Sequence, residues 1–254
     1  MDYMELVLLF FISVAANWFS ALAGGGAGLI QLPILIFMGL PFPLALATHK
    51  VATVALGAGA TLRHLRAGTL SAWLLLLILI SGVPGVWAGA VFILGVDSRA
   101  AETALGLLTL ALALYSWFSP TLGLSSEPRH RSSFDIILGG IVLLLIGFAN
   151  GALSAGSGLF VTLWLVYWFG LDYKTAVAQT LVAVGLGWNA TGALTMSLAA
   201  EVQWHWIPAL IAGSLLGGYL GANTSVRSGN RTIKRVYELV TLIVGLKLLA
   251  GALL

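Results

Sequence analysis

The chain has 254 residues, of which 59% are hydrophobic and only 8% are charged, and its formal net charge at pH 7 is +3. Soluble domains carry about a quarter charged residues, so this composition excludes an ordinary soluble domain and predicts a polytopic membrane protein. The chain contains no cysteine, which excludes a disulfide framework, a thiolate metal site and a cysteine nucleophile.

Eight apolar runs follow one another along the chain, and most reach the roughly 20 residues that a helix needs to cross a bilayer. The runs are residues 4–23, 43–62, 70–95, 100–118, 134–153, 173–196, 206–222 and 233–254. Strands of a membrane barrel would instead alternate over about 10 residues, so the fold is predicted to be all-α. The beginning, "MDYMELVLLFF", lacks the basic stretch and cleavage site of a secretory signal and is interpreted as a retained first helix.

Two glycine-rich segments interrupt the apolar pattern. "AGGGAG" at residues 23–28 and "SAGSG" at residues 154–158 each precede a short apolar segment. At about 12 residues, each segment is too short to cross the bilayer core straight. Glycine inside a helix costs about 1 kcal/mol relative to alanine, so we predict that the helix breaks at both places. Each interrupted pair could be two crossings or one re-entrant hairpin.

The two halves of the chain resemble each other around these breaks. "GAGLIQLPILIFMGLPFPLALATHKVA" (26–52) aligns with "GSGLFVTLWLVYWFGLDYKTAVAQTLVA" (156–183). Each half is predicted to contain a glycine-broken or re-entrant helix pair followed by three full transmembrane helices. The sequence therefore predicts a first transmembrane repeat at residues 1–118, a cytoplasmic linker at 119–133 and a second repeat at 134–254.

The cations predict which helix ends face the cytoplasm. If the connections alternate between two sides, residues 63–69, 119–133, 170–174 and 225–235 share one side and carry nine Lys and Arg residues, against two on the other side. Cytoplasmic loops carry an excess of Lys and Arg, so both termini are predicted to be non-cytoplasmic, in a bacterial inner (cell) membrane. Corresponding loops of the two halves then lie on opposite sides, which is the pattern of an inverted repeat in secondary transporters.

The two breaks are the predicted substrate site, because broken segments at matching positions of an inverted repeat indicate such a site. Bare backbone N–H groups and the positive end of the following half-helix would form an anion site without a cationic side chain. The break residues assigned to substrate binding are Gly24, Gly25, Gly26, Gly28, Gly156, Ser157 and Gly158. Close helix packing is the alternative, and it is favoured for Gly85, Gly89, Gly217 and Gly221.

The stretch "LATHKVA" (46–52) adds a charged group at depth. Lys50 lies about 7 residues into its apolar run, roughly 10 Å deep, where ionisable residues are functional by default; snorkelling to the interface is the alternative. His49 is interpreted as a proton-linked group or as a packing residue. Adjacent residues do not share a helix face, so His49 and Lys50 are not expected to reach one ligand. The predicted site is completed by Gln31, Thr48, Gln179 and Thr180, with Asn150 and Asn189 as further candidates.

The sequence "GGGAGLIQLPILIFMGLPFPLALATHKVA…RHLRAGTL" resembles the glycine-rich opening of the sulfite exporter TauE/SafE family, also called the toluene-sulfonate uptake permease group. The family pattern is a glycine cluster, an apolar segment with a proline, G-L-P, and a helix bearing T-N-K. Here these are residues 24–28, Pro33, residues 39–41 and residues 48–50, with His49 where the family often has asparagine. The resemblance covers nearly the whole chain and implies transport of small sulfur-containing or other organic anions, often outward.

We therefore expect a secondary transporter, an exporter of small anions such as sulfite or sulfonates, that works by alternating access. Its expected partners are a small anionic substrate, the lipid bilayer and a coupled proton or other ion, but no nucleic acid. An anion channel that uses the breaks as a selectivity filter is the alternative. A membrane-embedded enzyme would need more catalytic groups at depth than His49 and Lys50, and no P-loop is present, so no enzymatic activity, cofactor or metal is expected.

Overall fold

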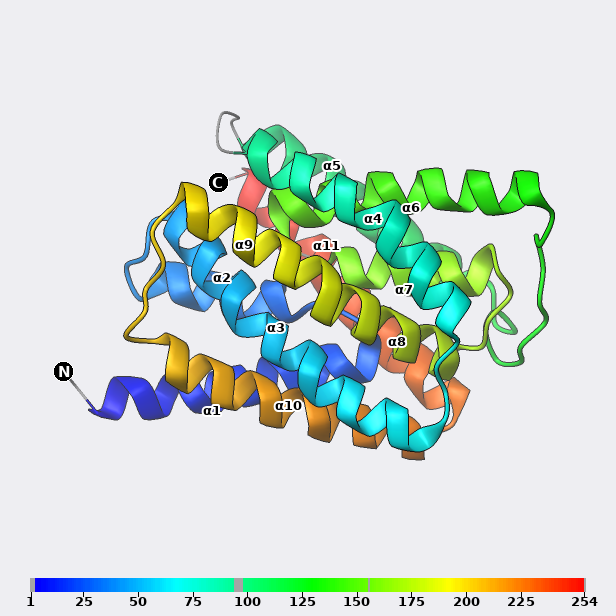
Figure 1. Cartoon of the computed structure of the whole chain (residues 1–254), viewed down its shortest axis with the longest axis horizontal. Coiled ribbons are helices and arrows are strands. Elements are labelled where there is room, and N and C mark those ends of the chain that lie inside the picture. Colours follow the sequence, from blue (N-terminus) through cyan, green and yellow to red (C-terminus); the bar gives the residue numbers. More distant parts are fainter. Residues whose placement is uncertain (1–2, 94–97, 155, 254) are drawn as a thin grey trace.

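The computed structural model describes residues 3–93, 98–154 and 156–253. Over these ranges the secondary structure is helical, without a strand (Figure 1). The elements are α1 (Tyr3–Ala23), α2 (Ala27–Phe37), α3 (Phe42–Ala67), α4 (Ala72–Phe92), α5 (Ser98–Phe118), α6 (Ser133–Leu153), α7 (Ser157–Tyr167), α8 (Tyr173–Val182), the π-helical η2 (Ala183–Trp188), α9 (Asn189–Ala199), α10 (Ile207–Arg227) and α11 (Asn230–Leu253). The predicted all-α class is confirmed.

Four helical stretches of the described chain are long and apolar enough to cross a membrane. They are α1, α4, α6 and the continuous stretch Tyr173–Ala199 that α8, η2 and α9 form together. Helices α3, α10 and α11 are also long, at 26, 21 and 24 residues, but they include more glycine, polar and charged residues. Length and composition thus indicate a protein that passes through the membrane several times.

Two predicted loops are shorter than hydropathy suggested. The loop predicted at 63–69 is largely helical, since α3 ends only at Ala67, where Gly68 adopts a left-handed φ of 65°. The loop predicted at 225–235 is also helical except for residues 228–229. Arg and Lys are good helix formers, so a helix does not need to end where its apolar run ends.

Helices α2 and α7 are about half as long as α1 and α6, the helices that precede them. Each has 11 residues, which is about 16 Å at 1.5 Å per residue and roughly half the hydrocarbon core of a bilayer. In Figure 1 both helices begin near the middle of the molecule and run toward opposite ends. Each returns toward the end at which the preceding full-length helix began.

The connections gather at the two ends of the helical bundle. Both termini lie at the left end in Figure 1, together with connections 38–41 and 200–206. Connections 68–71, 119–132 and 168–172 lie at the opposite end. Most of the cation-rich stretches therefore share one end of the molecule.

Glycines allow two pairs of long helices to pack closely. Helix α1 packs along α10, and α4 packs along α6. A Cβ atom on any of four glycines would collide with a backbone carbonyl oxygen of the facing helix. The pairs are Gly217 with Val14, Gly221 with Trp18, Gly85 with Leu144 and Gly89 with Phe148. The packing interpretation of these four glycines is confirmed.

Candidate functional site

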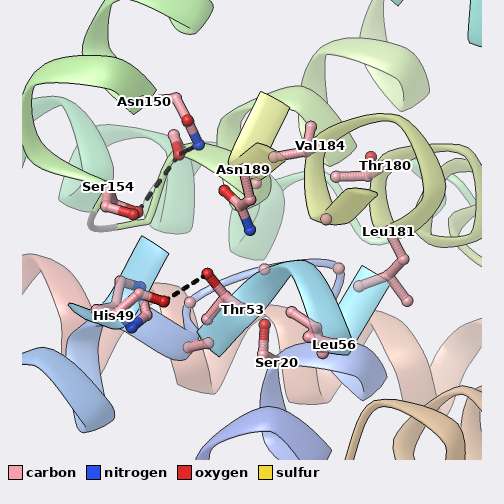
Figure 2. Close-up of a pocket in the computed structure, with 18 residues that line it drawn as sticks. Ser20, His49, Thr53, Leu56, Asn150, Ser154, Thr180, Leu181, Val184 and Asn189 are labelled. Carbon is pink, nitrogen blue, oxygen red and sulfur yellow. Dashed lines mark hydrogen bonds between the residues drawn. The ribbon is translucent and has the colours of Figure 1, made fainter. Parts of the chain in front are cut away.

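The N-terminal ends of α2 and α7 meet at one cavity in the middle of the molecule. Gly26, with φ 102°, precedes α2, and Gly156, with φ 73°, precedes α7; neither helix has a side-chain cap. The cavity is lined by Ser20, Gly24, Gly25, Gly26, Ala27, Gly28, His49, Thr53, Leu56, Asn150, Ser154, Ser157, Gly158, Thr180, Leu181, Val184, Gly185 and Asn189. Figure 2 shows the α3 side chains on one side of it and those of α6, α8 and α9 on the other.

The two glycine segments touch each other beside this cavity. A Cβ atom on Gly25 would lie 2.6 Å from the backbone nitrogen of Leu159 and 2.7 Å from Cα of Gly158. The Thr162 hydroxyl donates a hydrogen bond to the Gly24 carbonyl oxygen over 3.1 Å. Only residues without a side chain allow the two backbones to approach this closely.

The cavity is small, and its polar groups are the backbone at two helix starts together with hydroxyl, amide and imidazole side chains. Its volume is about 40 Å³, and one water needs roughly 10–15 Å³. Among the residues that the structure describes, no Asp, Glu, Lys or Arg lines it. The first N–H groups of a helix have no acceptor within the helix and carry the positive end of its dipole. Two such ends at one cavity suit a single small anion.

Lys50 lies one side chain behind the cavity wall. Its side chain is fully buried, and Nζ donates to the carbonyl oxygen and to Oδ1 of Asn150, both over 2.7 Å. Asn150 Nδ2 in turn donates to Ser157 Oγ over 2.7 Å. The two salt bridges found among the described residues do not involve Lys50. The snorkelling interpretation is therefore wrong, and Lys50 is a buried lysine that has no carboxylate partner among the described residues.

A chain of hydrogen bonds fixes the orientation of His49. The Ser13 hydroxyl donates to the Leu210 carbonyl oxygen over 2.8 Å and accepts from Gln31 Nε2 over 3.0 Å. Gln31 Oε1 therefore faces His49 Nδ1, at 2.8 Å, and an amide oxygen can only accept. Nδ1 carries the hydrogen, and Nε2 is the ring nitrogen left for a ligand, because no described residue bonds to it.

Eight of the thirteen predicted site residues line the cavity, and five do not. The eight are Gly24, Gly25, Gly26, Gly28, His49, Ser157, Gly158 and Thr180; the five are Gln31, Thr48, Lys50, Gly156 and Gln179. Gln31 orients His49, Lys50 holds Asn150, and Gly156 precedes the first turn of α7. Thr48 Oγ1 accepts from the Gln203 backbone over 3.0 Å, and Gln179 Nε2 donates to the Thr69 carbonyl over 3.3 Å. Thr48 and Gln179 point away from the cavity because each is adjacent in sequence to a lining residue, and successive residues face different sides of a helix.

Sequence reasoning named some of the residues that line the cavity and missed others. Asn150 and Asn189, the further candidates, both line the cavity. Thr53 was missed, although it lies four residues after His49 and therefore on the same helix face. Ser20, Leu56, Ser154, Leu181, Val184 and Gly185 were missed as well. Val184 and Gly185 belong to η2, a π-helical segment, and such segments are frequent at functional sites.

Comparison with known proteins identifies the family. The profile of the sulfite exporter TauE/SafE family matches residues 9–248. A "probable membrane transporter protein" of Haemophilus influenzae is 30% identical over 96% of this chain and 94% of its own. Escherichia coli K12 has YfcA, with the same description, which is 29% identical over 96% of this chain and 89% of its own. No solved structure gives a significant match. This chain is a multi-pass membrane protein that belongs to the sulfite exporter TauE/SafE family of membrane transporters.

Proposed function

We propose that this protein is a secondary transporter, an exporter, that carries a small anion such as sulfite or a small sulfonate across the bacterial inner membrane by alternating access. The observation that carries the proposal is that the N-terminal ends of two half-length helices, α2 and α7, meet at one cavity, and that no described residue contributes a carboxylate to its wall. Helix N-termini bind anions through their free N–H groups and dipoles. The names of the family and of its relatives support transport of this kind.

Lys50 supports an anionic substrate. A buried ion without a partner costs several kcal/mol in desolvation. The charged form of Lys50 carries this cost, because among the described residues its ammonium group bonds only to the neutral Asn150. An anion held by Asn150, Ser157 and the helix ends would offset part of that cost. A cation in the same place would increase it, so the site favours anions over cations.

The arrangement of the helices supports alternating access between two inverted repeats. Residues 1–118 and 134–254 would each supply five helical segments, with α2 and α7 as the short arms of re-entrant hairpins. The contact of α1 with α10 would then correspond to that of α6 with α4, and both pairs pack through glycines at carbonyl oxygens. A substrate held at the interface of such repeats becomes accessible from one side at a time when the repeats move against each other.

His49 supports coupling to a proton. Because Gln31 holds the hydrogen on Nδ1, neutral His49 would present the lone pair of Nε2 to the anion, which is repulsive. One added proton, on the imidazole or on the anion, turns this contact into a hydrogen bond. Among the described residues, Lys50 is the ionisable neighbour whose charge affects the protonation of His49. The side chains that α1 and α2 place beside it, Ser13 and Gln31, are neutral.

Exchange across proteoliposomes tests the proposed function. We expect uptake of labelled sulfite to saturate with concentration and to be accelerated by unlabelled sulfite on the far side, as alternating access requires. Flux that rises linearly with concentration and shows single-channel steps would favour an anion channel instead. For the coupling, binding in weakly buffered solution should take up about one proton per anion at a pH where the anion alone is unprotonated. His49→Asn should abolish this uptake, and unchanged uptake would remove His49 from the coupling.

A further inference from the structure

The first two turns of α11 carry three cations, and the first of them lies in the first turn, where the helix dipole disfavours a positive charge. Arg231, Lys234 and Arg235 follow directly after Asn230, the first residue of α11. The N-terminal end of a helix carries the positive end of its dipole, and cations there are unfavourable unless an anion lies nearby. The positions therefore raise the question of which anion compensates each of them.

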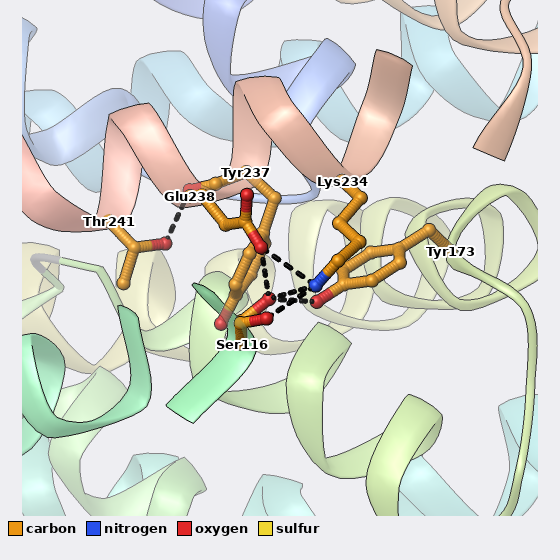
Figure 3. Close-up of polar contacts among 6 residues, drawn as sticks. All are labelled: Ser116, Tyr173, Lys234, Tyr237, Glu238 and Thr241. Atoms are coloured by element: carbon orange, nitrogen blue, oxygen red, sulfur yellow. Dashed lines mark hydrogen bonds and ion pairs between the residues drawn. The ribbon is translucent and has the colours of Figure 1, made fainter. Parts of the chain in front are cut away.

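Lys234 is compensated within the protein. Figure 3 shows its ammonium between Glu238 of the same helix and Ser116 of α5. Nζ lies 2.7 Å from Glu238 Oε1 and donates to the Ser116 carbonyl oxygen and Oγ over 2.5 and 2.9 Å. The Ser116 hydroxyl donates to Glu238 and is also 2.9 Å from the Tyr173 hydroxyl. This buried cluster joins α5, α8 and α11 and leaves no charge unmatched.

Arg231 and Arg235 are different, because both are exposed and neither forms a salt bridge with another described residue. They border a groove that is also lined by Trp117, Pro120, Leu239 and the ion pair of Lys234 and Glu238. Its volume is about 610 Å³. The groove is therefore large, open and positively charged, with apolar walls.

The same face of α11 continues as an apolar strip. Residues four apart along a helix lie on one face, and Arg231 and Arg235 are followed at this spacing by Leu239 and Ile243, which are 55% and 62% exposed. From Arg235 to Ile243 the strip runs about 12 Å along the helix. A free phosphate would use only the two cations, whereas a phospholipid would use the cations and the strip.

We propose that this groove binds an anionic phospholipid, with its phosphate between Arg231 and Arg235 and one acyl chain along Leu239 and Ile243. The guanidinium group suits a phosphate because it donates two parallel hydrogen bonds. Trp117, which is 62% exposed, lies at the helix end where tryptophan anchors a protein to the headgroup layer. The excess of cations in cytoplasmic loops explains why Arg231 and Arg235 lie near a helix end. It does not explain why they border a groove.

The test measures lipid binding to the full-length protein in neutral detergent by native mass spectrometry. Phosphatidylglycerol should bind more tightly than phosphatidylcholine. Since a basic residue near an anionic lipid surface contributes about 1 kcal/mol, the double variant Arg231→Gln/Arg235→Gln should weaken phosphatidylglycerol binding about 30-fold. Arg227→Gln, at the same end of the molecule but outside the groove, is the matched control and should leave binding unchanged.

Two further measurements distinguish binding of a lipid from binding of a free anion. Inorganic phosphate should not compete with phosphatidylglycerol at equal concentration, and Leu239→Asn should weaken lipid binding because it interrupts the apolar strip. Equal affinity for the two lipids, full competition by phosphate, or unchanged binding in the double variant would each overturn the proposal. None of these results depends on which anion the protein transports.

Discussion

Removing the charge of Lys50 is the sharpest test of how the central cavity attracts an anion. An anion in hydrogen-bond contact with the Asn150 side chain would lie about 6 Å from Lys50 Nζ, since Nζ is itself 2.7 Å from Asn150 Oδ1. At an effective dielectric constant of about 20, two unit charges at this distance interact by about 2.8 kcal/mol. Lys50→Met keeps the length of the side chain but removes the charge, so it should weaken sulfite binding about 100-fold.

A second variant cancels the same charge without removing the lysine. Asn150→Asp would give Lys50 a carboxylate at the distance now occupied by Oδ1, so the fold should be retained while the cavity becomes neutral or negative. We expect it to abolish sulfite binding. Lys174→Met, which removes a partly exposed cation near the start of α8 that does not line the cavity, is the control and should bind like the parent protein.

Isothermal titration with sulfite, together with melting temperatures in detergent, separates an electrostatic effect from misfolding. Lys50→Met leaves the Asn150 oxygens without their donor, so some loss of stability is expected from this variant alone. Asn150→Asp does not have that defect. If folded Asn150→Asp bound sulfite with the affinity of the parent protein, Lys50 would have no role in attracting the anion and the reasoning would be refuted.

Three further predictions concern the backbone and the topology. Gly25→Ala should lower the melting temperature strongly, because its Cβ would meet the backbone of Leu159 at 2.6 Å; a normal melting curve would contradict this packing. Gly156→Ala has room, with 3.4 Å to the nearest side chain, so it should fold, lose about 1 kcal/mol to its left-handed φ and bind sulfite more weakly; parental stability and affinity would contradict this. A fluorescent protein fused after residue 254 should stay dark, whereas one inserted in the 119–132 connection should fluoresce in the cytoplasm; the reverse pattern would overturn the orientation.

The positions of the long helices could be predicted because hydropathy over about 20 residues is a local property of the sequence. The run predicted at residues 134–153 corresponds to α6 at Ser133–Leu153, and that at 100–118 to α5 at Ser98–Phe118. Helix ends were harder to predict, because hydropathy indicates where the hydrocarbon layer ends and not where the helix ends. The family could also be predicted, because its motif is a contiguous stretch of sequence.

The partners of the polar residues could not be predicted. Lys50 donates to a residue 100 positions away in the chain, and no local pattern indicates such a contact. Gln31 was predicted to bind the substrate, but its side-chain amide forms hydrogen bonds with Ser13 and His49 instead. Gly192 of α9 lies against the Lys50 side chain, where a Cβ would come within 3.1 Å. Which polar side chains reach the cavity is thus set by how distant helices pack.

The central cavity divides recognition between two kinds of atoms. Backbone N–H groups at the ends of α2 and α7 would recognise negative charge, and every amino acid except proline supplies the same N–H. The size of the space is instead limited by the side chains of Leu56, Leu181 and Val184. Shortening one of these walls, as in Val184→Ala, would admit a bulkier anion without altering the groups that hold its charge. A new substrate range could therefore be engineered on α3, α8 and η2 while both glycine segments stay as they are.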